Sequence, residues 1–221
     1  MNIDILKLGI TIDSGFSISD ARRIRGFFGN AFRDNHYAHN HLQDGSFIYG
    51  YPLIQYKIVE NLCLIVGISE GMDMIKTIFS DLKMIKIGHN WEEILHKGLN
   101  KTNNPFGISN DEITYEFITP WLALNEANHK KYSIMGFKEK KKLFLERIIL
   151  GNIISMSKGL KYTIPDTIKI NLIKFKEIQT SLKGTPMLGF MGTFRVNFEI
   201  PDYFGLGKSV SRGFGTIVRV D

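Results

Sequence analysis

The chain has 221 residues, of which 43% are hydrophobic, and this is enough to bury one large core or two small ones. Its formal net charge of +6 favours a polyanionic partner, although a modest positive charge also serves solubility. The single cysteine, Cys63, excludes an internal disulfide, and no secretory leader or apolar run of membrane-spanning length is present. We therefore expect a cytoplasmic protein that does not enter a membrane.

The first 110 residues show the pattern of a ferredoxin-like (RRM-like) domain. Ser17 or Ser19 can cap a helix whose apolar stripe runs from Ile24 to Ala31. Glu60-Asn61 suits a two-residue hairpin turn. In chain order, we expect a strand over 3–12, this first helix, strands over 51–59 and 62–68, a helix over 72–82 and a closing strand over 84–87. The order βαββαβ is that of a ferredoxin-like unit.

A second domain is expected over residues 111–221, because the stretch 97–111 is rich in turn residues and favours a domain boundary. Its expected elements are a strand over 112–124 that Pro120 bends or keeps at an edge, a helix over 138–156, hairpin strands over 167–180 and 187–200 around Lys183-Gly184, and a last strand over 216–220. The second helix of a complete unit is missing, and a glycine-rich loop takes its place. The expected fold class is α+β, with tandem ferredoxin-like domains of which the second is incomplete.

This loop reads Gly205-Leu-Gly-Lys-Ser-Val-Ser-Arg-Gly-Phe-Gly215. A backbone without Cβ atoms can approach a phosphate closely, and Lys208 and Arg212 supply positive charge, although an ordinary flexible turn has the same composition. A P-loop is excluded, because Asp202 stands where its first glycine is required and a strand follows instead of a helix. The pattern resembles the glycine-rich signature of the RAMP superfamily of CRISPR-associated RNA-binding proteins.

The other informative stretch, residues 35–57, carries three histidines beside four tyrosines. His36, His39 and His41 could ligate a metal, but no cysteine or obvious carboxylate stands nearby to complete the site. A polar surface loop is the second interpretation. The third is acid–base catalysis on RNA, in which the ribose 2′-OH attacks the neighbouring phosphate. Histidine can transfer protons at neutral pH, and a tyrosine hydroxyl can orient the nucleophile.

Two groups of cations suit an anionic partner. Arg22, Arg25 and Arg33 share one face of the first helix, and those near its N-terminus oppose the helix dipole. The second group consists of Lys130, Lys131, Lys138, Lys140, Lys141 and Lys142. A solvated basic face is the alternative for both groups, and we favour it for the run 140–142.

The motifs together resemble one family, the CRISPR repeat-processing endoribonucleases of the Cas-six family, in the branch found with type I-B systems. The resemblance covers the whole chain in order. The motifs that carry it are Arg25-Gly-Phe-Phe-Gly-Asn, His39-Asn-His41, Tyr49-x-Tyr-Pro-Leu-Ile-Gln-Tyr-Lys57, Phe117-Ile-Thr-Pro-Trp-Leu-Ala-Leu-Asn125 and the terminal glycine loop.

The resemblance implies cleavage within the CRISPR repeat of a precursor transcript, without a metal or other cofactor, leaving a 2′,3′-cyclic phosphate and a 5′-hydroxyl. It maps the catalytic pair onto His41 and Tyr49, with His39 as an assisting or alternative group. The expected RNA contacts are Arg22, Arg25, Lys57, Gly205, Gly207, Lys208, Ser211, Arg212, Gly213 and Gly215. Subunits of a CRISPR effector complex and a second copy of the chain are further expected partners. The alternative function is a non-catalytic subunit that holds crRNA in an effector complex.

Overall fold

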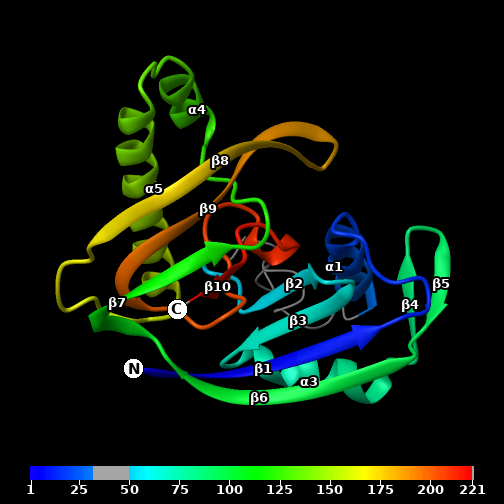
Figure 1. Ribbon diagram of the computed structural model, residues 1–221. Coiled ribbons are helices and arrows are strands. Elements are labelled where there is room, and N and C mark those ends of the chain that lie inside the picture. Colours follow the sequence, from blue (N-terminus) through cyan, green and yellow to red (C-terminus); the bar gives the residue numbers. More distant parts are fainter. Residues whose placement is uncertain (32–49, 221) are drawn as a thin grey trace, which may run out of the picture. The chain divides into compact units, whose positions relative to one another are not determined.

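The computed structural model describes residues 1–31 and 50–220, and Figure 1 shows their ribbon. The chain divides into two compact units. The N-terminal unit consists of Asn2–Asn104 together with Ser211–Gly213, and the C-terminal unit consists of Pro105–Val210 and Phe214–Asp221 together with Met1. Within the described residues, no helix combines the length and the apolar character needed to cross a membrane.

The N-terminal unit is built on a four-stranded antiparallel sheet with the order β2-β3-β1-β6. Its elements are β1 (Asn2–Thr11), α1 (Asp20–Ala31), β2 (Ile54–Val59), β3 (Leu62–Ile68), α3 (Gly71–Asp81), β4 (Met84–Ile87), β5 (Asn90–Glu93) and β6 (His96–Pro105). Glu60 and Asn61 both have positive φ, and the adjacent Val59 and Leu62 are paired. This confirms the predicted two-residue turn.

The core of this unit lies between the sheet and the two helices. Alternate residues from Leu6 of β1 to Ile12, just after this strand, enter one apolar cluster with Ile24 and Phe28 of α1 and with Ile75 and Ile78 of α3. The helical residues recur at spacings of three and four, so each helix turns a single stripe toward the sheet. Cys63 on β3 is fully buried in the same cluster.

The fourth strand of this sheet is not the one that the sequence suggested. Met84–Ile87 is a strand, but it pairs with β5 in a separate hairpin, while β6 occupies the edge beside β1. The turn-rich stretch 97–111 is therefore mostly strand, in β6 and in β7 of the next unit. Its asparagine, lysine and glycine residues have low strand propensity, and pairing with distant strands outweighs that local preference.

The C-terminal unit contains a second four-stranded antiparallel sheet, with the order β10-β7-β9-β8. Its elements are β7 (Gly107–Phe117), α4 (Glu126–Ser133), α5 (Lys138–Gly159), β8 (Ile170–Leu182), β9 (Thr185–Glu199), a 3-10 turn (Val210–Arg212, of which the last two residues belong to the N-terminal unit) and β10 (Ile217–Arg219). The hairpin of β8 and β9 turns at Lys183-Gly184, as predicted. The strand expected over 112–124 is shifted to Gly107–Phe117, and α4 was not predicted.

Aromatic side chains fill the core of this second sheet. Phe190, Phe194 and Phe198 of β9 are four residues apart, so they lie on one face of the strand, and all three are buried. Phe117 stacks on Trp121 with a centroid distance of 5.0 Å. The helix α5 adds Leu145, Ile149, Ile153 and Met156, all at 1% exposure or less.

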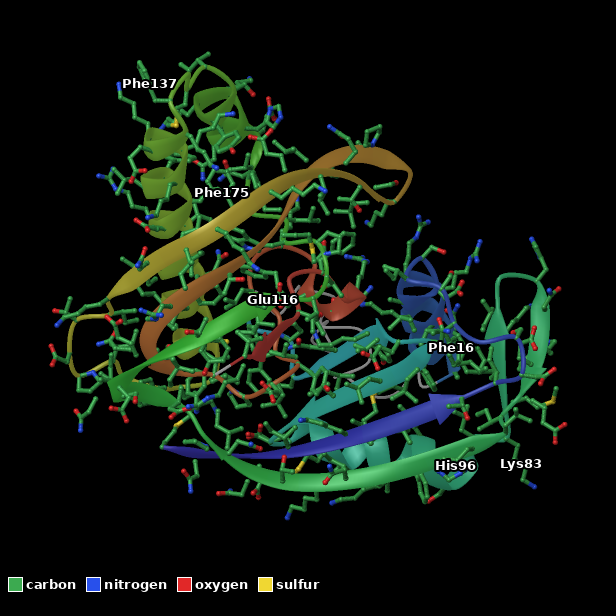
Figure 2. The ribbon with its side chains drawn as sticks, viewed as in Figure 1. Phe16, Lys83, His96, Glu116, Phe137 and Phe175 are labelled. Atoms are coloured by element: carbon green, nitrogen blue, oxygen red, sulfur yellow. The ribbon has the colours of Figure 1, made fainter. Side chains whose placement is uncertain are left out.

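Both sheets place the first and third strands of their unit at the centre and the second and fourth at the edges. The α+β class with tandem ferredoxin-like domains is thereby confirmed. The second unit lacks the helix between its third and fourth strands. There, residues 200–216 form a loop whose described helical structure is the single 3-10 turn. Figure 2 shows the side chains of the described residues on the same ribbon.

Candidate nucleic-acid interface

The glycine-rich loop folds back on itself in the C-terminal unit. Gly205 forms an isolated bridge with Thr216, and the Leu206 amide donates to the Gly215 carbonyl at 2.8 Å. Gly205 and Gly215 are buried, so the role that the structure gives them is to hold the loop. Their predicted contact with RNA stays a prediction.

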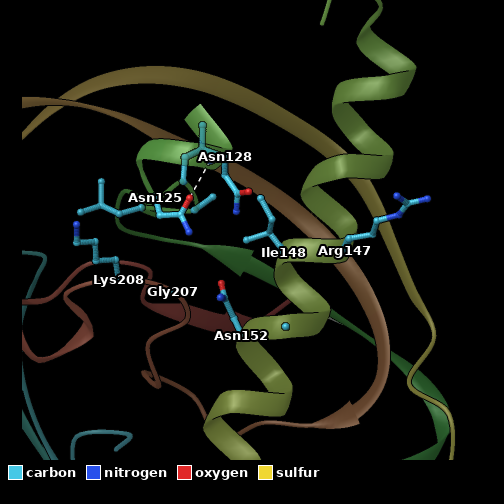
Figure 3. A pocket seen from close by; sticks show the side chains of 11 residues that line it. Asn125, Asn128, Arg147, Ile148, Asn152, Gly207 and Lys208 are labelled. Carbon is cyan, nitrogen blue, oxygen red and sulfur yellow. Dashed lines mark hydrogen bonds between the residues drawn. The ribbon is translucent and has the colours of Figure 1, made fainter. Parts of the chain in front are cut away.

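Gly207 brings Lys208 to the edge of a cavity. Its φ is +89°, and a Cβ atom there would lie 2.6 Å from Nε1 of Trp121, so only glycine fits. The next amide, of Lys208, donates to the Leu122 carbonyl at 3.2 Å, while the Lys208 side chain is exposed. Figure 3 shows Gly207 and Lys208 beside this cavity of about 500 Å³, opposite α5.

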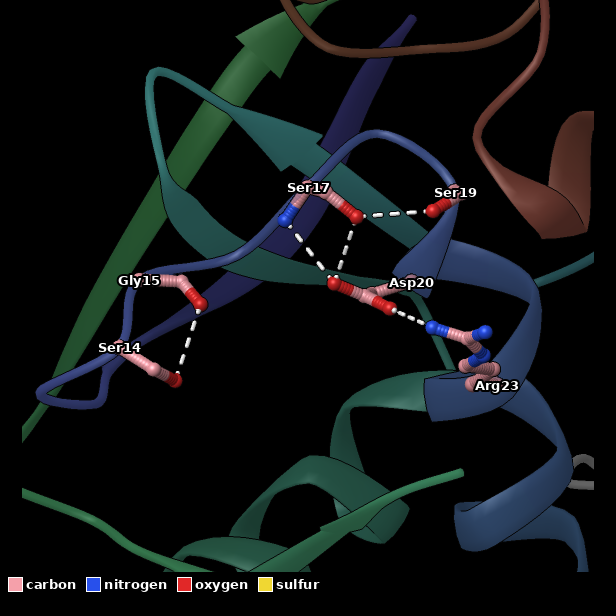
Figure 4. A network of polar contacts seen from close by, with 6 residues as sticks. All are labelled: Ser14, Gly15, Ser17, Ser19, Asp20 and Arg23. Carbon is pink, nitrogen blue, oxygen red and sulfur yellow. Dashed lines mark hydrogen bonds and ion pairs between the residues drawn. The ribbon is translucent and has the colours of Figure 1, made fainter. Parts of the chain in front are cut away.

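At the start of α1, one carboxylate gathers three donors. Asp20 accepts hydrogen bonds from the Ser17 amide at 2.9 Å, from the Ser17 hydroxyl at 2.8 Å and from Nη1 of Arg23 at 2.8 Å (Figure 4). Burial alone would raise the pKa of Asp20, but these hydrogen bonds and the charge of Arg23 outweigh it and hold the pKa below its ordinary value. The Ser17 side chain therefore acts as a donor to Asp20 rather than as the predicted cap acceptor. Arg23 is neutralised within its own helix.

The neighbouring Arg22 and Arg25 have no such counter-ion among the described residues. Arg22 is exposed and Arg25 is half-buried beside Tyr56. Burial lowers the pKa of the Arg25 guanidinium. The Tyr56 ring stacks on Phe28 with a centroid distance of 5.6 Å, which ties this part of β2 to α1.

The tripeptide Ser211–Gly213 belongs to this same N-terminal unit and adds a third arginine. Gly213 has φ +86°, and a Cβ atom there would lie 3.0 Å from the Tyr56 carbonyl oxygen and 3.3 Å from Cβ of Ala21. The absence of a side chain thus lets the tripeptide lie against β2 and the first turn of α1. Ser211 is 8% exposed at this position.

Arg212 is repelled by the charges of the other two arginines. Burial, and then the charges of Arg25 and Arg22, lower the pKa of the Arg212 guanidinium. Within residues 1–31 and 50–220, no carboxylate forms an ion pair with any of the three. We call Arg22, Arg25 and Arg212 the arginine cluster. Like charges held together without counter-ions form a site for an anion, and guanidinium groups match phosphate oxygens in pairs.

Lys57, also expected to contact RNA, is fully buried in β2. Burial lowers the pKa of its ammonium group to about 7. Its side chain is not accessible to solvent in this structure, and a direct contact with RNA stays a prediction.

Two family models match the chain. The Cas6b N-terminal domain covers residues 1–104, and the Cas6b C-terminal domain covers residues 107–220. The chain belongs to the Cas6b family. The family resemblance expected from the motifs is confirmed.

Solved structures of Cas6b proteins agree with this assignment. A crystal structure of Cas6b is 36% identical, covers 100% of both chains and has a TM-score of 0.91. A second, titled as the CRISPR RNA processing endoribonuclease Cas6b, is 33% identical, covers 98% of this chain and 100% of its own, and has a TM-score of 0.78. The uncharacterized protein MJ0978 of Methanocaldococcus jannaschii is 46% identical over 116 residues, which are 52% of this chain and 78% of its own.

The predicted catalytic residues of this Cas6b chain, His39, His41 and Tyr49, lie outside the described residues, as do Arg33 and the alternative metal ligand His36. The described chain leaves α1 at Ala31 and enters β2 at Ile54. Both elements belong to the unit that carries the arginine cluster.

Sequence reasoning missed the polar residues of α4 and α5 that line the cavity. Asn125 caps α4, where its side chain accepts from the Asn128 amide at 2.8 Å. The signal was present, since an asparagine followed by glutamate is a common helix start. Nothing in the sequence pattern singled out Asn152 on α5.

The lysine-rich segment, Lys138 and Lys140–Lys142 at the start of α5, differs from the arginine cluster. Lys141 pairs with Glu177 at 3.0 Å and lies over the Tyr132 ring. Lys138 and Lys140 lie over Phe175 and Phe137, at 6.0 Å and 5.4 Å from the ring centroids. Both rings are labelled in Figure 2. Most of this charge is already engaged within the unit.

Proposed function

We propose that the chain is an endoribonuclease that cleaves CRISPR repeat RNA within a precursor transcript. Membership of the Cas6b family supports this, because one relative is named a CRISPR RNA processing endoribonuclease. The observation that carries the proposal is the arginine cluster. Three guanidinium groups without carboxylate partners among the described residues lie on the unit that holds both ends of the segment 32–49.

The arginine cluster would bind the RNA backbone. Its contacts would go to phosphate oxygens, which position the strand without reading its sequence. Mutual repulsion among the three groups is relieved when phosphates lie between them, so binding is favoured most strongly at low salt.

Cleavage would use the substrate's own nucleophile. The 2′-oxygen attacks the adjacent phosphorus as its proton is removed, and the bond from phosphorus to the 5′-oxygen breaks as that oxygen gains a proton. The products are a 2′,3′-cyclic phosphate and a 5′-hydroxyl. We assign the proton transfers and the orientation of the 2′-hydroxyl to His41 and Tyr49, with His39 assisting, since histidine titrates near neutral pH.

The test uses repeat RNA with the wild type and His41→Ala in the presence of EDTA. The wild type should cleave, and His41→Ala should be at least about 100-fold slower while binding equally well. His129→Ala, which removes an exposed histidine of α4, is the matched control and should cleave like the wild type. A 2′-deoxy nucleotide at the scissile position should be bound and left intact.

The outcomes separate the alternatives. Cleavage that EDTA abolishes would contradict the metal-free reaction. Tight RNA binding by the wild type without cleavage would instead support the non-catalytic subunit. Association with effector-complex subunits and formation of a homodimer stay predictions.

A further inference from the structure

The cavity beside Lys208 is large enough for a small ligand. Its volume of about 500 Å³ falls within the range of about 300–1,000 Å³ that is usual for ligand pockets. It lies entirely in the C-terminal unit, between α5, the start of α4 and the glycine-rich loop. The lining residues that matter here are Leu122, Leu124, Asn125, Ile148, Asn152 and Lys208.

Hydrogen bonds fix the orientation of two amide side chains in this cavity. The Trp121 indole donates from Nε1 to Oδ1 of Asn152 at 3.0 Å, and the Asn128 amide donates to Oδ1 of Asn125 at 2.8 Å. An indole N–H and a backbone N–H can only donate, so both amide oxygens must face them. The NH₂ groups of Asn125 and Asn152 remain available as donors.

Lys208 adds positive charge to these donors. Its backbone is held by the Leu122 carbonyl, and within the described residues its ammonium group forms no ion pair. Arg147 also lines the cavity, but Figure 3 shows its side chain directed away from Asn152 and Lys208. Lys208 is therefore the cation that the cavity offers to a ligand.

Apart from Asn128 and Arg147, the remaining residues that line the cavity are apolar or glycine. Leu122 and Leu124 are almost fully buried, and Ile148 of α5 contributes a further aliphatic surface. A flat ring can pack against such walls while its edge reaches the amides. The cavity thus combines apolar walls, the two oriented NH₂ donors of Asn125 and Asn152, the side-chain amide of Asn128 and the cation Lys208, and none of the described residues that line it is a carboxylate.

We propose that this cavity binds a single unpaired nucleotide, with its phosphate at Lys208 and the carbonyl oxygens of its base at the NH₂ groups of Asn125 and Asn152. This inference rests on the proposed function, because the ligand is one nucleotide of the RNA substrate. Uracil and guanine present carbonyl acceptors, whereas the exocyclic group of adenine is a donor. The cavity therefore prefers uridine or guanosine to adenosine.

The test uses the full chain with Trp91→Phe, which leaves Trp121 as the one tryptophan of the two in the sequence. Trp91 is 57% exposed and lies in the other unit. Trp121 contacts Asn152 directly, so occupation of the cavity should change its fluorescence. Uridine monophosphate should give a saturable change, adenosine monophosphate should bind about tenfold more weakly, and inorganic phosphate at the same concentrations should give little change.

Asn152→Asp is the decisive variant. It keeps an oxygen for the Trp121 indole but replaces the NH₂ donor by a negatively charged acceptor, so uridine monophosphate should bind at least about tenfold more weakly. Ser155→Asp adds the same charge to an exposed position of α5 that does not line the cavity, and it should bind like the parent. Lys208→Gln should also weaken binding, and circular dichroism confirms that each variant is folded.

Three results would overturn the inference: no saturable change with uridine monophosphate, equal affinity for the adenosine form, or unchanged binding by folded Asn152→Asp. Cleavage of repeat RNA by the same preparations keeps the two proposals apart. If the protein cleaves RNA but its fluorescence does not change when the nucleotide is added, only the cavity proposal fails. If the nucleotide binds as expected but repeat RNA is never cleaved, only the proposed function fails.

Discussion

The arginine cluster and the lysine-rich segment contain similar numbers of cations, but their side chains have different partners within the fold. In the arginine cluster, no described carboxylate pairs with the guanidinium groups, and burial followed by the charges of Arg25 and Arg22 lowers the pKa of Arg212. In the lysine-rich segment, a carboxylate and three aromatic rings engage most of the ammonium groups. Both regions are runs of cations in the sequence, and the partners that their side chains find in the fold distinguish them.

This difference indicates which of the two regions should bind an anion more strongly. Exposed lysines that already have partners lose those contacts when they bind a phosphate, so the net gain is small. When a phosphate binds between arginines that repel one another, its negative charge attracts each guanidinium group and offsets the repulsion between them. We therefore assign RNA binding to the arginine cluster before the lysine-rich segment.

The largest expected effect compares two triple variants that remove equal charge. Arg22→Ala/Arg25→Ala/Arg212→Ala should weaken repeat RNA binding about 100-fold at 0.15 M salt, and it should reduce the slope of log affinity against log salt by about two. Lys138→Ala/Lys140→Ala/Lys142→Ala should weaken binding less than about threefold. Filter binding at several salt concentrations measures both. Equal losses in the two triples would contradict the distinction between the regions.

A second pair of variants tests whether the backbone conformation at Gly213 is needed to position Arg212. Gly213→Ala combines a positive φ with a 3.0 Å approach to the Tyr56 carbonyl, so it should lower the free energy of unfolding by about 2–4 kcal/mol and weaken RNA binding. Gly184→Ala has nearly the same φ, +84°, with no atom within 4 Å of the added Cβ. It should cost only about 1–2 kcal/mol and leave binding unchanged. Urea unfolding and filter binding give the two readouts, and intact RNA binding by Gly213→Ala would show that the loop position is not needed.

Lys57 differs from both groups because it is fully buried. Its burial should make the free energy of unfolding depend on pH. Because burial lowers its pKa from its ordinary value of 10.5 to about 7, the unfolded state holds up to one more proton than the folded state between these two pH values. The free energy of unfolding should therefore rise by about 1 kcal/mol per pH unit between pH 7 and 9, relative to Lys57→Met. Urea titrations of both proteins across this range measure the difference. Parallel pH profiles would mean that Lys57 is charged in the folded protein.

The smallest effect separates two adjacent arginines of α1. Arg23 is paired with Asp20, whereas Arg22 belongs to the arginine cluster. Arg22→Ala should weaken RNA binding severalfold, and Arg23→Ala should change it less than about twofold and lower stability by at most about 1 kcal/mol. The same binding and unfolding assays apply. A larger binding loss for Arg23→Ala than for Arg22→Ala would reverse the proposed roles.

Local signals were enough to predict much of the fold. The hairpin at Glu60-Asn61 follows from residues that tolerate positive φ, and α5 and β9 follow from their own periodicity. By contrast, β6 contains asparagines, lysines and glycine, and it is a strand because β1 offers an edge far away in the sequence. No window of local sequence contains that information.

The candidate site divides in the same way. Arg22, Arg25 and Arg212 were named from the sequence, but their grouping depends on Gly213 lying against β2. The burial of Lys57 could not be predicted, because β2 is an edge strand that is nonetheless buried on both faces. The catalytic assignment to His39, His41 and Tyr49 stays a prediction, since these residues lie outside the described part of the chain.

The assignment of Ser211–Gly213 to the N-terminal unit has a consequence for protein synthesis. Almost all of the C-terminal unit is translated between Arg25 and Arg212, which takes on the order of ten seconds or more at usual rates of elongation. Until then, the nascent chain displays two of its three guanidinium groups. If the arginine cluster binds RNA as proposed, its full attraction for phosphates would arise only after the ribosome has made the second sheet, so translation itself would delay capture of RNA by an unfinished polypeptide.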